Sequence, residues 1–137
     1  MLRRLAWMLM PAAFAWAGGF FLTIHGPDSA GQIKGAVLTV TAEGCQDYSH
    51  ARITGQAEGA MQGHRQSIPL ELIATGKPGT YAVRKQWPSD GKWVLVFNGT
   101  AGERQTHTMV EFGPDGRLRP RLTMRPLSPE EIEAALR

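Results

Sequence analysis

The chain has 137 residues, of which 42% are hydrophobic and 20% charged, a size and composition that fit one globular domain and exclude wholesale disorder. The formal net charge is +3, but Arg3 and Arg4 lie in a targeting segment, and the remaining 13 basic and 12 acidic residues exclude the strong basic footprint of a nucleic-acid-binding protein. The single cysteine, Cys45, excludes an intrachain disulfide, and we expect its side chain to be buried, as free cysteines commonly are.

The first 17 residues have the order of an export signal. Residues 1–4 are basic, residues 5–14 are apolar, and Ala15-Trp16-Ala17 fits a small-x-small cleavage pattern. We therefore expect cleavage after Ala17 and a periplasmic or secreted protein. The alternative is an uncleaved anchor over residues 5–24, a run of about 20 residues that Pro11 and the Gly18-Gly19 pair interrupt. In both cases the basic start keeps the N-terminus in the cytoplasm and the rest outside.

A turn-rich stretch follows the signal, and residues 18–32 are interpreted as a linker. Residues 33–125 then contain short β-type runs that alternate apolar and polar side chains, separated by Gly-, Pro- and Asp-rich turns. Seven strands are expected, over residues 35–42, 50–56, 66–74, 80–87, 92–97, 104–112 and 117–124. This pattern predicts an all-β, seven-stranded immunoglobulin-like β-sandwich, with Trp93 and Tyr81 in its core.

The turns and the C-terminal tail support this organisation. The sequences 76–79, 89–91 and 113–116 each have the Gly, Pro or Asp-Gly chemistry of a hairpin turn. Residues 126–137 form the tail, in which Ser128 is a good N-cap, Pro129 suits the first helical position and Glu131 completes a capping box. A short C-terminal helix is therefore expected.

One group of residues is similar to a known family. Pro78-Gly79-Thr80-Tyr81, followed by Trp87-Pro88 and by Gly91-Lys92-Trp93-Val94-Leu95, resembles a motif of the YtkA-like and FixH-like periplasmic domains. Those domains are immunoglobulin-like sandwiches related in fold to CopC-type copper-resistance proteins. The resemblance covers about residues 34–112 and implies the fold more than an activity. CopC-type proteins hold copper partly with an N-terminal histidine, which the expected mature end, Gly18-Gly19-Phe20, does not have.

Copper is nevertheless the first cofactor to consider. His107 and Met109 are two residues apart and hence on one face of a strand, and Met61 and His64 lie near each other in a loop. Imidazole and thioether ligands together suit Cu(I), so a copper-binding or copper-delivery protein is the alternative function. The competing interpretation makes Met109 a core residue and the histidines solvated polar residues.

The sequence does not have the usual motifs of an enzyme. It contains no Gly-x-Ser-x-Gly, no His-Glu-x-x-His and no phosphate-binding loop. Ser49 and His50 are adjacent, so a strand would point them to opposite faces. We therefore expect a non-enzymatic binding or accessory module of the bacterial envelope, without a resident cofactor.

The most distinctive surface feature is a row of arginines. Arg117, Arg119, Arg121 and Arg125 alternate with apolar residues near the C-terminus, and Pro120 between them predicts an edge strand. One interpretation is a dock for an acidic protein partner or for anionic envelope lipid. The other is that charge and proline protect the sheet edge from pairing with another chain.

Overall fold

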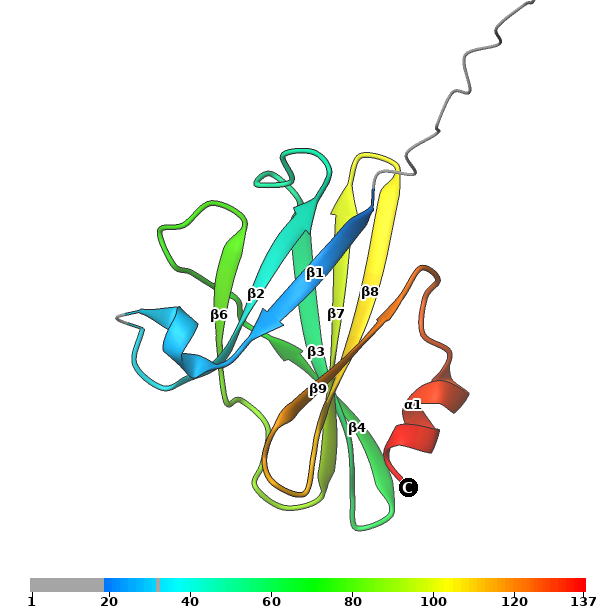
Figure 1. Ribbon diagram of the computed structural model, residues 1–137. Coiled ribbons are helices and arrows are strands. Elements are labelled where there is room, and N and C mark those ends of the chain that lie inside the picture. Colours follow the sequence, from blue (N-terminus) through cyan, green and yellow to red (C-terminus); the bar gives the residue numbers. More distant parts are fainter. Residues whose placement is uncertain (1–18, 32) are drawn as a thin grey trace, which may run out of the picture.

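The computed structural model describes residues 19–31 and 33–137. They form two antiparallel sheets stacked as a sandwich, with one short helix against the outside of the larger sheet (Figure 1). The four-stranded sheet has the order β1 (Phe20–His25), β2 (Ala36–Gly44), β6 (Thr80–Arg84), β5 (Ile73–Ala74). The five-stranded sheet has the order β4 (His64–Leu70), β3 (Arg52–Met61), β7 (Lys92–Ala101), β8 (Arg104–Phe112), β9 (Leu118–Thr123). A 3-10 helix, Pro27–Ala30, follows β1, and α1 spans Pro129–Ala135.

The predicted all-β class, the stacked antiparallel sheets and the short C-terminal helix agree with this structure. The predicted number of strands is wrong, because the described residues form nine strands rather than seven. One additional strand comes from the N-terminal stretch, and the other comes from the division of a single predicted strand.

The first additional strand, β1, lies in the segment that was interpreted as a linker. Its residues alternate in the β pattern, so that Phe20 and Leu22 are buried while Phe21 is 36% exposed. β1 pairs with β2 over its full length and packs across the sandwich against β8. In the sequence, the residues of β1 closely follow the apolar segment of the predicted signal. The strand's alternation of apolar and polar residues is therefore hard to recognise. The predicted signal peptide, residues 1–17, lies outside the described residues.

The second difference is a division of the predicted strand over residues 66–74. Its first part is β4 in the five-stranded sheet, and its last part is β5 in the other sheet. The chain crosses between the sheets at Glu71, where the Gln86 side chain accepts from the Glu71 N–H at 2.8 Å and donates to its carbonyl at 3.2 Å. This side chain satisfies the backbone groups that leave both ladders at the crossing.

The core depends on a match between small and large residues on β3 and β7. In the register of the two strands, Gly55 lies opposite Phe97 and Gly59 lies opposite Trp93. A Cβ added at Gly59 would come within 2.3 Å of the Trp93 ring. Trp93 is buried as predicted, with 6% exposure, whereas Tyr81 is half-buried.

Two of the three predicted hairpin turns are confirmed. The turn over residues 76–79 joins the paired strands β5 and β6, and the turn over residues 113–116 joins β8 and β9. The prediction for residues 89–91 is wrong, because β6 and β7 belong to different sheets and the segment is a crossover between them. Asp90-Gly91 forms a sharp turn in which Gly91 has a φ of +81°, but this turn does not join two paired strands.

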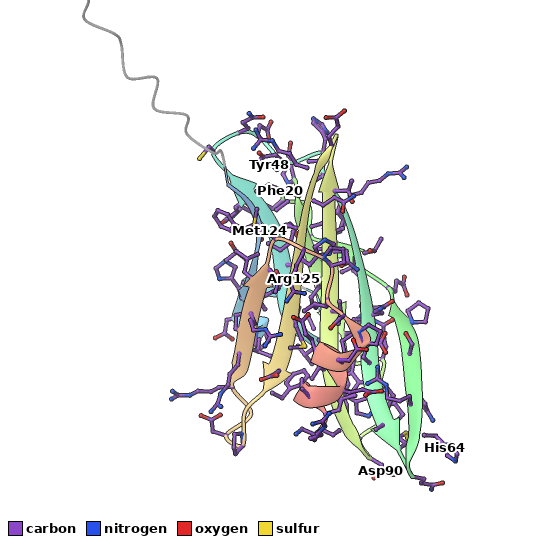
Figure 2. All side chains as sticks on the ribbon, turned by 90° about the vertical axis from the view of Figure 1, so that its right-hand side faces the viewer. Phe20, Tyr48, His64, Asp90, Met124 and Arg125 are labelled. Atoms are coloured by element: carbon purple, nitrogen blue, oxygen red, sulfur yellow. The ribbon has the colours of Figure 1, made fainter. Side chains whose placement is uncertain are left out.

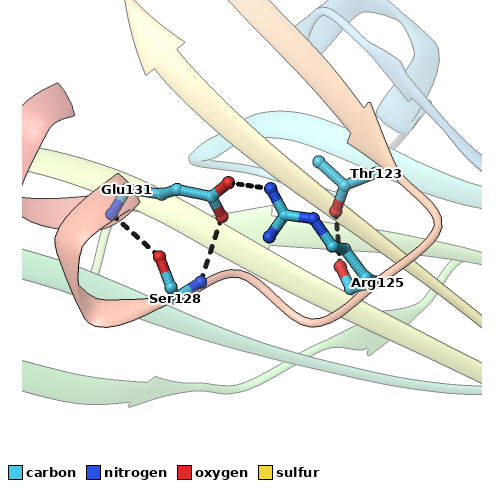
Figure 3. Close-up of polar contacts among 4 residues, drawn as sticks. All are labelled: Thr123, Arg125, Ser128 and Glu131. Atoms are coloured by element: carbon cyan, nitrogen blue, oxygen red, sulfur yellow. Dashed lines mark hydrogen bonds and ion pairs between the residues drawn. The ribbon is translucent and has the colours of Figure 1, made fainter.

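Helix α1 covers an apolar patch on the outer face of the five-stranded sheet. Ile132, buried to 8% exposure, packs with Val94, Val96 and Met109. The predicted capping box is present: the Ser128 hydroxyl accepts from the Glu131 N–H, and the Glu131 carboxylate accepts from the Ser128 N–H (Figure 3). The cap and the buried face together hold a helix too short to be stable alone.

Candidate functional site

A cleft opens at the end of the sandwich that carries Asp90 (Figure 2). Its volume is about 520 Å³, and it is bounded by the crossover between β6 and β7, by the hairpin between β8 and β9, and by the last turn of α1. Three segments that are distant in sequence therefore meet around one hollow. Pockets of this size and position are the usual place to look for a ligand.

Aromatic rings form one wall of the cleft. The rings of Trp87 and Phe112 lie 5.8 Å apart between centroids, at an interplanar angle of 38°. Phe112 is 36% exposed although it is a large apolar residue. Trp93 lines the cleft while its indole N–H donates to the Asp90 carbonyl at 2.8 Å. The wall therefore presents flat apolar surface, and the Trp93 indole N–H already has its hydrogen-bond acceptor.

Three cationic side chains, from Lys85, Lys92 and Arg119, line the same cleft. The Lys85 ammonium donates to the Ser89 hydroxyl at 2.6 Å, and the Lys92 ammonium donates to the Arg137 carbonyl at 2.5 Å. The described lining contributes one carboxylate, from Glu111, which lies opposite Arg119 in the β8–β9 register. The lining is therefore positive by formal charge.

The four predicted partner-binding arginines do not form one continuous row. Arg119 and Arg121 lie on β9, whereas Arg117 precedes the strand and Arg125 follows it. The Arg117 guanidinium lies 3.4 Å from the Asp115 carboxylate, and Arg125 forms an ion pair with Glu131 (Figure 3). Two of the four charges thus have partners within the chain.

The ion pair at Arg125 connects the arginines to the helix cap. The hydrogen bond from Arg125, and then that from the Ser128 N–H, lower the pKa of Glu131, and Arg121 adds a smaller attraction. The same hydrogen bond raises the pKa of Arg125. The capping-box pattern marks Glu131 in the sequence, but no local signal indicates that Glu131 is an acidic neighbour of the arginines.

Strand β9 is an edge strand, as Pro120 predicted, and it pairs with β8 alone. The Gly113 N–H donates to the Arg117 carbonyl at the turn. Because hydrogen-bonded and non-hydrogen-bonded pairs alternate along an antiparallel ladder, Arg119 and Arg121 turn their backbone groups toward β8, and Pro120 faces the free edge. The missing N–H of Pro120 therefore weakens the edge as a template for another strand.

The predicted copper ligands fall into two separate groups. His107 and Met109 share the outer face of β8, but Met109 is fully buried beneath α1. Met61 and His64 face each other at the β3–β4 turn, at the opposite end of the sheet (Figure 2). The strand rise places Lys92, beside that turn, about 20 Å along β7 from Asn98, which lies beside His107. One ion therefore cannot contact both pairs in this fold.

His107 has a distinct environment within that set. Its side chain is buried, its Nδ1 lies 2.6 Å from the Asn98 Oδ1, and its Nε2 finds no hydrogen-bond partner among the described residues. Because an amide oxygen only accepts, this contact places the proton on Nδ1. Burial lowers the pKa of His107, so the neutral form is favoured.

Several residues of the site could not be identified from sequence patterns. Lys85 and Phe112 belong to no motif, and Trp87 and Lys92 belong only to the motif of the resemblance, which implies the fold. Their arrangement around the cleft follows only once the crossover brings β6, β7 and β8 together. Cys45 corrects another expectation, since its side chain is exposed rather than buried. In the described ranges, no three His, Cys, Asp or Glu side chains gather as they do at a metal site.

Comparisons with known proteins give no relative from which to transfer a function. No family model, no curated protein and no solved structure matches this chain. Among the residues that the structure describes, no helix has both the length and the apolar character needed to cross a membrane.

Proposed function

We propose that the chain is an exported, non-enzymatic binding module with an immunoglobulin-like fold, and that it docks on an acidic surface of a partner protein through Arg119 and Arg121 on β9. The observation that carries the proposal is the pair of arginines on a free sheet edge. Neither side chain forms an ion pair with a carboxylate of the described residues, and both are exposed. Carboxylates of a partner can each engage a guanidinium through two parallel hydrogen bonds.

The apolar residues beside these arginines support docking. Leu122 is 49% exposed and Met124 is 70% exposed, and both follow Arg121 closely in the sequence. Arginine and methionine are both enriched at protein interfaces. Pro120 opposes pairing of another strand with this edge, so contact through side chains is favoured over strand addition.

An acidic protein is favoured over an anionic membrane as the partner. Asp115, Glu111 and Glu131 lie among the arginines, so the positive charge on this face is local. Recognition of anionic lipid by charge requires a larger cluster of basic residues. Two separated guanidinium groups suit carboxylates at defined positions on a folded surface.

Export is supported by the position of β1. Because residues 20–24 belong to a strand in the sandwich, the apolar run left for a membrane helix shortens to about 15 residues. A run of that length is closer to the apolar region of a cleaved signal than to a spanning helix.

The docking proposal is tested with a double variant, Arg119→Ser with Arg121→Ser, and with the corresponding double Lys variant. Pull-down from envelope extract is combined with sedimentation on vesicles that contain phosphatidylglycerol. We expect the parent to retain a partner, the Lys variant to retain less and the Ser variant to lose it, since Lys keeps the charge but not the planar fork. Arg52→Ser, at an exposed position on β3, is the control and should behave like the parent.

Equal retention by the parent and the Ser variant would contradict the proposal and leave the arginines as edge protection. Sedimentation of the parent with vesicles, lost in the Ser variant, would instead assign the arginines to lipid.

A further inference from the structure

We propose that the cleft beside Trp87 is a binding site for a small organic anion with a flat apolar part, such as an aromatic carboxylate or phosphate ester. Arg119 belongs both to this cleft and to the docking pair, whereas Arg121 belongs to the docking pair alone, and the cleft proposal would stand if no protein partner bound the edge. The inference rests on how aromatic, cationic and backbone groups are arranged around one hollow.

The size and the wall of the cleft fit such a ligand. A volume of about 520 Å³ lies within the range of small-molecule pockets. Trp87 and Phe112 form a tilted pair with 5.8 Å between ring centroids, on which a flat ring can pack by offset or edge contacts. Exposure of 36% at Phe112 leaves apolar surface that a ligand would remove from water.

The charges of the cleft select an anion. Lys85, Lys92 and Arg119 approach it from three different elements, and Glu111 is the carboxylate that the described lining contributes. The Lys85 ammonium donates to the Ser89 hydroxyl and the Lys92 ammonium to the Arg137 carbonyl, and an ammonium has three donors. Donors therefore remain for the oxygens of a carboxylate or phosphate, and charge-assisted bonds are the stronger kind.

The arrangement also provides a reporter of binding. The chain contains four tryptophans, of which Trp7 and Trp16 lie in the predicted signal. The other two, Trp87 and Trp93, both line the cleft. In the chain that starts at residue 18, tryptophan fluorescence thus comes entirely from the proposed site.

The experiment titrates the purified chain, starting at residue 18, with phenylacetate and with phenyl phosphate, and follows tryptophan fluorescence and calorimetric heat. Phenylacetamide is the neutral match of phenylacetate, and acetate tests the anion without the ring. We expect a saturable signal with at least one aromatic anion, and binding about tenfold weaker for phenylacetamide and for acetate, since each lacks one half of the recognised chemistry. A preference between the two aromatic anions distinguishes a carboxylate site from a phosphate site.

Variants test whether the binding is in the cleft. Lys85→Gln and Arg119→Gln should each weaken the aromatic anion about tenfold and leave phenylacetamide unchanged. Lys77→Gln, on the β5–β6 turn outside the cleft, should bind like the parent. Thermal unfolding of each variant verifies that it is folded, and the exposed Lys85 side chain makes its variant the safer of the two.

Three results would overturn the proposal. They are no saturable signal with either aromatic anion up to about 20 mM, equal affinity for phenylacetate and phenylacetamide, or parent-like binding by both cleft variants. None of these results bears on the protein partner, because Arg121→Ser alone, at a residue that does not line the cleft, tests docking separately from Arg119.

Discussion

At the scale of single residues, His107 combines burial with an incomplete hydrogen-bonding pattern. Its Nδ1 is engaged by Asn98, and its Nε2 is shielded from solvent without a partner among the described residues. Protonation would put a charge and a new N–H donor in this position. Burial accounts for the lowered pKa of His107, and the residue opposite His107 on β9 is the uncharged Thr123.

The lowered pKa of His107 predicts that stability falls in mild acid. The unfolded chain takes up a proton near the ordinary value of 6.5, before the folded chain does. The free energy of unfolding should therefore decrease as the pH falls below about 6.5, and this loss should level off once the pH is below the pKa of the folded state.

Urea unfolding at about pH 7.5 and pH 5 measures the effect. The fall in the unfolding midpoint should be smaller in His107→Gln than in the parent, while His64→Gln, at an exposed position, should behave like the parent. The same fall in the parent and in His107→Gln would assign the pH dependence to other groups.

At the scale of elements, the β3–β7 pairing shows most clearly how the side-chain sizes on one strand are matched to those on its neighbour. The inner face of β3 carries Gly55, Ala57 and Gly59, and the facing residues of β7 are Phe97, Leu95 and Trp93. The small residues leave the space that the large side chains occupy, because interiors are packed nearly without voids. Glycine inside a strand normally weakens it, and here close approach of aromatic rings explains its presence.

This pairing predicts that Gly59→Ala destabilises the protein by about 1–3 kcal/mol, the usual cost of overpacking a core. The added methyl would lie 2.3 Å from a Trp93 ring atom, and a buried ring has little room to move. Denaturant unfolding measures the change. Gly26→Ala is the control, since a Cβ there meets nothing within 4 Å and should change stability by less than about 0.5 kcal/mol.

A midpoint for Gly59→Ala equal to that of Gly26→Ala would show that the ring can shift without loss. Rescue of Gly59→Ala by a smaller ring in Trp93→Phe would identify the clash as the cause.

The elements also show how far sequence patterns reach. Strict alternation located β8 over residues 104–112, and cap chemistry located α1, because both signals are local. Local signals do not assign strands to sheets. Asp90-Gly91 predicts a hairpin, yet Trp87 lies within a crossover between the sheets and Trp93 lies on the strand that follows it. The cleft depends on that crossover, so Lys85 and Phe112 could not be associated before the topology was known. His107 and Met109 were correctly placed on one face, whereas nothing local indicated that Met61 lies at the far end.

At the scale of the whole molecule, β1 closes one edge of the four-stranded sheet and contributes to the core between the sheets. Phe20 packs against Tyr48 with 4.5 Å between ring centroids, and Leu22 is buried beside Gly99. The first described residues are thus part of the domain rather than a tether to it.

Removal of β1 should therefore destabilise the entire sandwich. A chain starting at residue 26 should lose about 3 kcal/mol or more relative to one starting at residue 18, because two large apolar side chains leave the core. Unfolding midpoints measure the loss. Leu22→Ala should lower the midpoint strongly and Phe21→Ala weakly, since the first side chain is buried and the second exposed. Equal midpoints for the two chains would show that β1 is an accessory strand.

In the proposed export, the short distance between the predicted cleavage point and β1 constrains the order of cleavage and folding. The Gly19 carbonyl accepts from the Cys45 N–H at 3.3 Å, and β1 begins at the next residue. A peptidase needs an extended, accessible segment, and only two residues separate Ala17 from the folded backbone. Strand β1 packs against β8, and in the proposed export residues 104–112 would follow the predicted signal across the membrane only late. Strand β2 can pair with β1 earlier, but the core between the sheets also requires β8, so in the proposed export the signal would be removed before the sandwich is complete.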